Sequence, residues 1–248
     1  MEKLQKAKRI AVDCHTLEIN NWAGKEYFLN NLINELTCLG GNFEFLFYFR
    51  KPVYKKSPLP NWRVISVNLP TPFWHFYILA HMLISRVDIF FAPCAYFLSA
   101  LNFFIPQAVV IHDLTTFLPA VRKTHKIRIR LIEKFFLRRS LKTSKKIIAV
   151  SENTKNDLIK LFGIGTDKIA VIYEAPRPSF KPIKEKEEIR KVLEKYRLPQ
   201  NFILFVGTIE PRKNIVRLIE AYKETIIGGR FKDYKLVEKV ISVPKLEY

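Results

Sequence analysis

Residues 201–222 read NFILFVGTIEPRKNIVRLIEAY, and this stretch decides the fold of the second half of the chain. The apolar run at 202–206 predicts a buried strand, and the apolar spacing after Asn214 predicts a helix. Arg212 and Lys213 therefore stand where a strand passes into a helix. The first amides of a helix lack intrahelical partners, and the helix dipole adds positive charge there. We predict an anion site at this junction, with Arg212 and Lys213 as its cations.

The same rhythm of apolar runs and amphipathic segments precedes this junction. Strand patterns occur at 9–13, 43–49, 63–67, 87–92, 108–112, 145–151 and 168–173. Helical patterns occur at 25–39, 73–85, 126–142 and 152–162, and Ser151 is expected to cap the last of these helices. Strands that alternate with helices predict a doubly wound, mostly parallel α/β sheet, in which ligands bind at the carboxyl ends of strands.

A change of composition at 175–200 divides the chain. This segment is rich in proline and carries a charged helical pattern at 184–196. We predict a Rossmann-like domain at 1–175, a linker at 176–200 and the incomplete start of a second Rossmann-like domain at 201–248. That second part is expected to hold one strand–helix unit, because Glu238 and Lys239 are expected to break a strand that begins at 234–237.

The composition limits the classes of protein that fit. The chain has 248 residues and a formal net charge of +19, which favours anionic partners such as nucleic acid, acidic lipid or phosphorylated ligands, or simply indicates a lysine-rich background. The three cysteines, Cys14, Cys38 and Cys94, form no C-x-x-C pair, so neither a zinc site nor a disulfide framework is expected. No apolar run follows the basic N-terminus, so we expect no signal peptide and a cytoplasmic protein.

One uncharged stretch, 89–111, is long enough to span a bilayer. Pro93 and Pro106 divide it into short pieces. The stretch is interpreted as two buried strands that flank an aromatic loop, and the alternative is a transmembrane helix in an integral membrane protein.

The order of these motifs along the chain resembles the GT-B glycosyltransferases of the family-4 type, close to bacterial mannosyltransferase-like members. The matching pieces are 10–13, Gly24, 111–114, 148–152, 169–172 and 205–214. In that family two Rossmann-like domains face each other. The resemblance implies that the acceptor binds mainly to the N-terminal domain and the nucleotide-sugar to the C-terminal domain.

The resemblance implies roles for five residues. Arg212 and Lys213 match the pair that holds the donor diphosphate, and Gly24 matches a glycine where backbone approaches the donor phosphates. His112 matches a histidine beside the transferred sugar, and Asp113 completes a His-Asp pair, so these two are the predicted catalytic residues. The alternatives are a solvated loop for the cations, a strand-end histidine with satisfied hydrogen bonds, and a turn glycine. The usual Gly-Ile-Gly-Arg loop reads Ala-Gly-Lys-Glu here, with one glycine missing.

No D-x-D triplet occurs in the sequence. Metal-dependent glycosyltransferases use that triplet to hold a cation at the diphosphate, so we expect no metal and no other cofactor. Arg212 and Lys213 would neutralise the leaving phosphate instead.

The family's second acidic motif, a glutamate loop that grips the ribose and donor sugar, has no counterpart in these residues. We therefore expect a chain truncated within the donor domain by a frameshift, or a split enzyme whose remaining part is a second chain. The implied reaction is a retaining transfer from a nucleotide-sugar, such as GDP-mannose, to a glycan or lipid-linked glycan, with the chain alone inactive.

The segment from Arg122 to Lys146 carries eleven lysines and arginines and one glutamate. Ile127, Leu131, Phe135 and Phe136 form an apolar stripe at helical spacing, which in the simplest interpretation packs on the sheet. The alternative is peripheral contact with anionic lipid at the inner face of the cell membrane, where each cation contributes about 1 kcal/mol. A nucleic-acid-binding module without catalysis is a further alternative, but no zinc-finger, RNP or KH pattern supports specific nucleic-acid binding.

Overall fold

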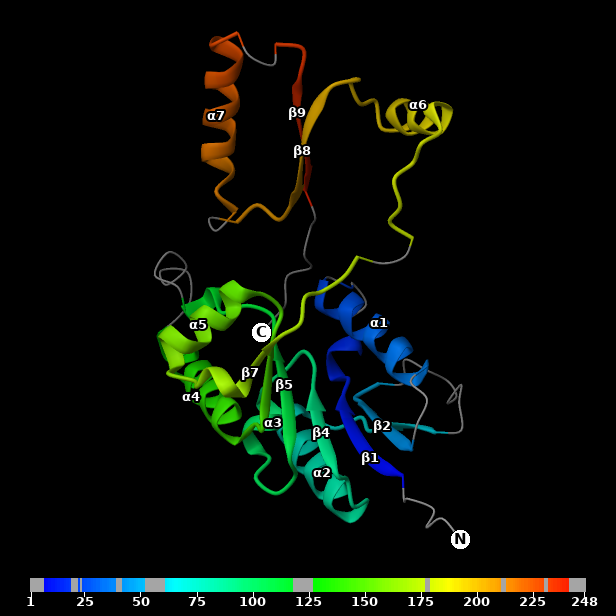
Figure 1. Ribbon diagram of the computed structural model, residues 1–248, viewed down its shortest axis with the longest axis vertical. Helices are drawn as coiled ribbons and strands as arrows, with labels where there is room; N and C mark the ends of the chain where they lie inside the picture. Colours follow the sequence, from blue (N-terminus) through cyan, green and yellow to red (C-terminus); the bar gives the residue numbers. More distant parts are fainter. Residues whose placement is uncertain are drawn as a thin grey trace. The chain divides into compact units, whose positions relative to one another are not determined.

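In the computed structural model the chain forms two compact units, Met1–Ala175 and Pro176–Tyr248 (Figure 1). The structure describes residues 7–18, 22, 24–38, 42–51, 61–117, 127–176, 179–210, 213–229 and 232–240. Arg212 lies outside these residues, as do residues 122–126 of the basic segment and the side chain of Ile127.

The first unit is built on a seven-stranded sheet whose neighbouring strands all run parallel, in the order β3-β2-β1-β4-β5-β6-β7. The strands are β1 Lys8–Asp13, β2 Phe43–Phe49, β3 Trp62–Ser66, β4 Ile89–Ala92, β5 Gln107–Ile111, β6 Lys146–Ala149 and β7 Ile169–Val171. This confirms the doubly wound parallel sheet. The order reverses between β1 and β4, and the crevice outside the carboxyl ends of such strands is where ligands bind.

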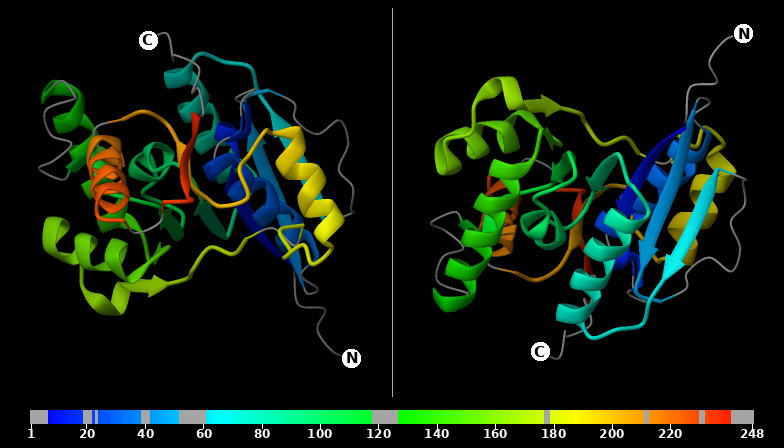
Figure 2. Two further views of the ribbon diagram at one scale, coloured as in Figure 1. Left: turned by 90° about the horizontal axis from the view of Figure 1, so that it is seen from above. Right: turned by 90° about the horizontal axis from the view of Figure 1, so that it is seen from below.

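Helices cover both faces of this sheet, but unevenly (Figure 2). They are α1 Gly24–Cys38, α2 Thr71–Ile84, α3 Phe97–Leu101, α4 Ile127–Thr143 and α5 Glu152–Phe162, with 3-10 turns η1 His15–Glu18, η2 Thr115–Phe117 and η3 Thr166–Lys168. Leu29 and Ile33 of α1 pack with Val12 on one face. The helices α2 to α5 contribute to the core on the other face. The connection from β1 to β2 runs toward one edge of the sheet, and the connections from β3 onward run toward the other edge. Because crossovers between parallel strands are right-handed, connections in opposite directions place their helices on opposite faces.

The apolar runs of the strands follow from this coverage. Along β2, Phe45 and Phe47 pack in the α1 core, whereas Leu46 and Tyr48 pack in the core under α2 to α5. Successive side chains of a strand point to opposite faces, so a strand covered on both faces must be apolar throughout.

The uncharged stretch 89–111 forms β4 and β5, as expected, but the segment between them is not only a loop because it contains α3. Asn102 ends that helix: its Oδ1 accepts from the amide of Ile105 at 3.1 Å, and its Nδ2 donates to Gln107 Oε1 at 2.8 Å. The two buried side-chain amides hydrogen-bond to each other and to the backbone of the turn. Buried polar groups need such partners, which explains why Asn102 and Gln107 occur in an apolar stretch. None of the described helices is long and apolar enough to cross a membrane.

The predicted cap of α5 is confirmed. Ser151 Oγ accepts a hydrogen bond from the Thr154 amide at 3.1 Å, and Gly163 ends the helix with a left-handed φ of 66°. Both ends therefore use the residues that favour them, an N-terminal serine and a C-terminal glycine.

The second unit contains α6 Lys186–Lys195, β8 Phe202–Gly207, α7 Ile215–Ile227 and β9 Lys235–Val240. The prediction that Glu238 and Lys239 break the last strand is wrong, because β9 pairs in parallel with β8 from Lys235 through Val240. Glu238 is exposed, so its charge does not oppose the strand. The unit is therefore a strand–helix–strand rather than one strand–helix pair.

The expectation that 202–206 is a buried strand is also wrong for the described residues. Leu204 and Val206 of β8 are exposed. Among the described residues β8 pairs with a single strand, β9, so its side chains are not enclosed as those of a central strand would be.

Candidate functional site

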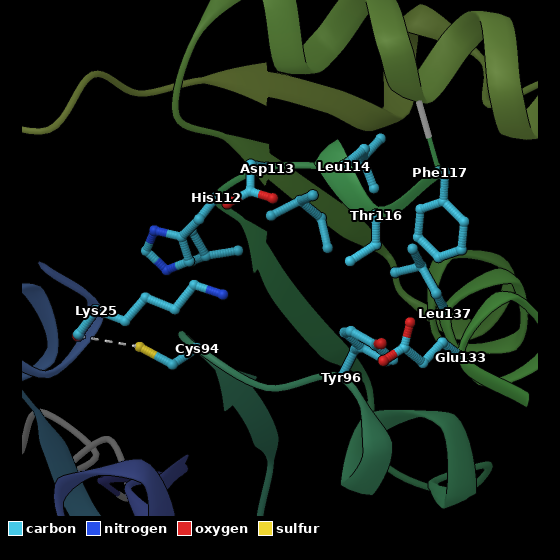
Figure 3. A pocket seen from close by; sticks show the side chains of 12 residues that line it. Lys25, Cys94, Tyr96, His112, Asp113, Leu114, Thr116, Phe117, Glu133 and Leu137 are labelled. Carbon is cyan, nitrogen blue, oxygen red and sulfur yellow. Dashed lines mark hydrogen bonds between the residues drawn. The ribbon is translucent and has the colours of Figure 1, made fainter. Parts of the chain in front are cut away.

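A pocket opens at the carboxyl end of β5, where ligands of parallel sheets bind (Figure 3). It has a volume of about 190 Å³, and we call it the β5 pocket. Its lining residues are Lys25, Cys94, Tyr96, Val110, Ile111, His112, Asp113, Leu114, Thr116, Phe117, Glu133 and Leu137. Two of the five predicted site residues, His112 and Asp113, thus lie together on one cavity, and Lys25 follows a third, Gly24, directly in the chain.

Both ring nitrogens of His112 have partners. Nε2 lies 2.9 Å from the Pro93 carbonyl oxygen, and Nδ1 lies 2.8 Å from Oε1 of Glu174. The edge of the Phe28 ring packs against the imidazole, with centroids 4.9 Å apart. Both partners are hydrogen-bond acceptors, so the imidazole is held between a carbonyl and a carboxylate.

The pattern matches the simpler alternative for His112, a strand-end histidine with satisfied hydrogen bonds. A ligand could contact Nδ1 only if Glu174 moved away. The His112 side chain is 10% exposed and that of Glu174 is 44% exposed, so the carboxylate is the group more open to solvent. Sequence reasoning missed Glu174, because no pattern links it to a histidine 62 residues earlier.

Asp113 shapes the turn that follows His112. Its Oδ1 accepts from the amide of Thr115 at 3.2 Å and from the Thr115 hydroxyl at 2.8 Å. This is the local hydrogen bonding of an Asx turn, and it begins η2, whose residues line the pocket. Thr154 of α5 donates to the His112 carbonyl oxygen at 3.2 Å and so ties the end of β5 to the cap of that helix.

Gly24 is the first residue of α1, and the protein's own packing does not require a glycine there. A Cβ added at this position would meet nothing within 4 Å, and its φ is not in the left-handed region. The structure therefore contains open space at the helix start. The predicted approach of donor phosphates to Gly24 stays a prediction.

Lys213 belongs to the second unit and is exposed. Its amide donates to the Glu210 carbonyl oxygen at 2.9 Å, which closes the turn between β8 and α7. Asn214 caps α7 with a left-handed φ of 54° and makes no side-chain capping hydrogen bond. The first amides of α7 therefore have no side-chain cap from Asn214, as the predicted anion site requires. Arg212 lies outside the described residues, so its part in the site stays a prediction.

A second polar group lies at the end of β1, beside the reversal of strand order, and sequence reasoning missed it. Asp13 is buried, and its Oδ1 accepts from His15 Nδ1 at 2.7 Å and from the His15 amide at 3.2 Å. Its Oδ2 is buried without a hydrogen-bond partner in the described residues. The signal was present in the sequence, because Asp13 and His15 directly end the first apolar strand.

An aromatic wall surrounds His15. The ring of Trp74 lies 5.5 Å and that of His75 lies 6.2 Å from it. Burial lowers the pKa of His75, while its hydrogen bond to the Thr71 carbonyl and the Asp13 carboxylate act in the opposite direction. His15, which is paired with Asp13, therefore packs against Trp74 and His75 of α2. Burial favours the neutral form of His75.

The thiols near the site are not activated. Burial raises the pKa of Cys94 to about 12, and it raises the pKa of Cys14 well above its ordinary value. A nucleophilic cysteine needs the opposite shift. In the part of the chain that the structure describes, no group of three or more His, Cys, Asp or Glu side chains is placed to hold a metal ion.

Solved structures with this architecture identify the fold. The chain is similar to Anabaena Alr3699/HepE in complex with UDP-glucose, with a TM-score of 0.55 and 12% identity over 94% of this chain and 69% of that one. The same protein in complex with UDP gives a TM-score of 0.52 and 13% identity over 93% and 69%. At these identities the likeness concerns the fold, which is the Rossmann-like GT-B fold.

The family follows from the sequence of the first unit. Residues 22–175, more than half of the chain, match Glycosyltransferase Family 4, and the chain belongs to this family. It is 35% identical over 129 residues to O-antigen chain mannosyltransferase B of Escherichia coli, which covers 49% of this chain and 33% of that protein. It is 30% identical over 138 residues to O-antigen chain mannosyltransferase RfbU of Salmonella typhimurium, which covers 52% and 34%. The matches span about a third of each relative.

Proposed function

We propose that this chain is part of a retaining glycosyltransferase that moves a sugar from a nucleotide-sugar to a glycan or lipid-linked glycan. The observation that carries the proposal is the family match over 22–175, together with the β5 pocket that holds His112 and Asp113 at the carboxyl edge of the sheet. The similar proteins are named mannosyltransferases, which supports GDP-mannose as the donor. In this scheme Met1–Ala175 is the acceptor domain, and the strand–helix–strand of the second unit begins the donor domain.

The donor diphosphate would lie at the start of α7. Lys213 and Arg212 would supply positive charge there, and the first amides of the helix would donate hydrogen bonds. As the bond to the sugar breaks, negative charge grows on the leaving diphosphate. A fixed cation stabilises that charge by about 3 kcal/mol, which corresponds to roughly a hundredfold in rate.

His112 would contact the transferred sugar from the first unit. Glu174 holds Nδ1 at 2.8 Å, so the carboxylate has to leave before that nitrogen can donate to a sugar hydroxyl. We propose that Glu174 keeps the imidazole oriented until the sugar replaces it. Asp113 and Thr154 then act as positioning residues, because they fix the turn and the carbonyl on either side of the imidazole.

Radiolabel transfer from GDP-mannose in the intact enzyme, with the remainder of the donor domain present, tests this function. Lys213→Ala is expected to lower turnover about a hundredfold and to weaken donor binding. His112→Ala is expected to lower turnover with donor affinity nearly unchanged. Lys223→Ala is the matched control, because Lys223 is an exposed cation of the same helix α7 beyond its first turn. Full activity in both test variants would contradict the proposed site.

A second candidate function, docking on a membrane surface, is favoured by the exposed side of α4. The interpretation in which Leu131 and Phe135 pack on the sheet is wrong, because these side chains are 64% and 59% exposed. The sheet is instead covered by Leu137 and Leu141, which lie on the opposite side of the helix. Leu131 and Phe135 therefore point outward among cations of the same helix, whereas Phe136 packs against Phe97 of α3 with ring centroids 4.3 Å apart.

Neighbouring elements extend this exposed apolar surface. Phe104, before β5, is 76% exposed, and Phe103 beside it lies under the Arg139 guanidinium of α4, 4.1 Å from the ring centroid. Exposed apolar and aromatic residues flanked by Lys and Arg are typical of helices that lie in the interface of an anionic bilayer. We propose that this surface docks peripherally at the inner face of the cell membrane.

Sedimentation with lipid vesicles tests the membrane proposal. The chain is expected to bind vesicles that contain 30% phosphatidylglycerol and to be released by high salt only in part, because the apolar residues also insert. Leu131→Ser with Phe135→Ser should abolish most binding, whereas Leu161→Ser, an exposed apolar residue of α5, should not. Equal binding by the double variant and the wild type would contradict insertion of this surface.

A further inference from the structure

The one acidic residue of α4, Glu133, faces the β5 pocket. Glu133 and Leu137 lie one helical turn apart and both line the cavity, so this edge of α4 forms part of its wall (Figure 3). The helix otherwise carries only cations among its charged residues. In the described part of the chain, the Glu133 carboxylate makes no hydrogen bond or ion pair, although cations surround it along the helix. A half-buried carboxylate is costly without a donor, so a ligand that donates hydrogen bonds would stabilise it.

Tyr96 lies next to Glu133 on the same wall (Figure 3). Burial raises the pKa of Tyr96 to about 12, and the Glu133 carboxylate contributes to the shift. The phenol therefore stays protonated at neutral pH and can donate a hydrogen bond. The two side chains together offer a strong acceptor and a donor on the side of the cavity opposite His112 (Figure 3).

The rest of the cavity suits a small polyhydroxylated ring. Leu114, Phe117 and Leu137 supply apolar surface, and Thr116 and Asp113 supply further polar groups. The volume of about 190 Å³ is below the range of pockets for drug-sized ligands and fits one ring rather than a chain of rings. The lining contains the carboxylates of Asp113 and Glu133 and the ammonium of Lys25, so charged groups of both signs face the cavity. Carboxylates accept strong hydrogen bonds from hydroxyl groups.

We propose that Glu133 and Tyr96 bind the hydroxyl groups of one neutral hexose residue of the acceptor glycan in the β5 pocket. This assignment rests on the proposed function, because it takes the acceptor to be a glycan. Glu133 is a recognition residue here and not a catalytic one. It accepts hydrogen bonds from hydroxyl groups of the acceptor and holds them on the side of the cavity opposite His112.

Chemical-shift titration of the isotopically labelled 248-residue chain with methyl α-mannopyranoside tests the proposal. Shifts are expected at residues of the β5 pocket. Glu133→Gln keeps the size of the side chain but removes a charge-assisted hydrogen bond, so the Kd should rise by about tenfold or more. Tyr96→Phe should raise it less. Glu35→Gln, which removes an exposed carboxylate of α1, should leave it unchanged.

A separate arm with GDP-mannose distinguishes this proposal from the proposed function. Hexoside binding that depends on Glu133, without any GDP-mannose shifts in the second unit, would support the subsite and contradict the donor assignment. The subsite is wrong if methyl α-mannoside, methyl α-glucoside and methyl β-galactoside all leave the pocket resonances unchanged. It is also wrong if inorganic phosphate binds there more tightly than the hexosides, or if Glu133→Gln and Glu133→Asp bind like the wild type at an unchanged melting temperature.

Discussion

Oε1 of Glu174 lies 2.8 Å from Nδ1 of His112, although the two residues are 62 positions apart in the chain. The chain after β7 passes back over the end of β5, where His112 lies, so the contact belongs to the first unit. It places a half-exposed carboxylate on the nitrogen that the proposed reaction needs.

If Glu174 only holds the imidazole until a sugar replaces it, Glu174→Ala should not weaken hexoside binding to the β5 pocket. The free energy of unfolding should fall by less than about 1 kcal/mol, because the Glu174 side chain is 44% exposed and water can replace its hydrogen bond. His112→Ala should weaken hexoside binding. Titration and urea unfolding measure both quantities, and a loss of hexoside binding in Glu174→Ala equal to that in His112→Ala would contradict a displaceable contact.

Ser151→Ala should lower the free energy of unfolding by about 1 kcal/mol, because the Thr154 amide loses its capping partner. The effect should extend to the pocket, since Thr154 also holds the His112 carbonyl oxygen. Urea unfolding measures the first effect, and the shift of the His112 amide resonance measures the second. Asn153→Ala, an exposed neighbour in the same first turn, serves as control and should change neither.

Thiol labelling at neutral pH should modify one cysteine quickly. Cys38 is exposed at the end of α1, whereas burial raises the pKa of Cys14 and of Cys94 and keeps both as thiols. One equivalent of an aromatic disulfide reagent should react in the native chain, none in Cys38→Ser, and the remaining two only after unfolding. Two or more rapid equivalents in the native wild type would show that one of the pocket-side thiols is accessible and ionised.

Stability should fall as the pH is lowered from about 6.5 to 5. Burial lowers the pKa of His75 from its ordinary 6.5, and it does the same for His81. Below that value the unfolded chain binds protons that the folded chain does not, so the folded state loses up to about 1.4 kcal/mol per pH unit from the buried His75. His81 is more exposed and contributes less. His75→Asn, which can still donate to Thr71, should flatten this slope. An unchanged slope in melting experiments would mean that His75 does not contribute.

The sheet could be predicted from the sequence because its strands are covered on both faces. Each such strand must be a continuous apolar run, as in β4 and from Phe45 to Phe49 in β2, whereas the edge strand β3 contains the exposed Arg63. The strand β9 was misjudged, since an exposed strand tolerates Glu238 and carries no such run. The exposure of β8 was missed for a related reason, as a sequence pattern does not reveal how many neighbours a strand has.

The candidate site could be predicted only where a motif adjoins a strand end. His112 and Asp113 follow β5 directly, and they were found. Glu133 belongs to α4 and reaches the β5 pocket only in the folded chain. Glu174 belongs to the segment after β7 and reaches His112 only in the folded chain. The outward stripe of α4 was assigned to the wrong face because apolar spacing predicts one apolar side of a helix but not what covers it.

Binding of a nucleotide-sugar at the start of α7 is the central claim, and a chemical-shift titration of the 248-residue chain with GDP-mannose tests it most directly. Two charge-assisted hydrogen bonds of about 1.5–3 kcal/mol each sum to about 3–6 kcal/mol. Because Lys213 is exposed and solvent weakens its interactions, we expect the lower end of that sum, which corresponds to a Kd of several millimolar. The amides of Lys213 and of the first turn of α7 should shift with GDP-mannose and with GDP alike, but not with free mannose, and Lys213→Ala should weaken binding while Lys223→Ala does not. The account would be contradicted if no nucleotide-sugar shifted these amides at concentrations up to about 20 mM, which is above the expected Kd. It would also be contradicted if Lys213→Ala left the shifts unchanged.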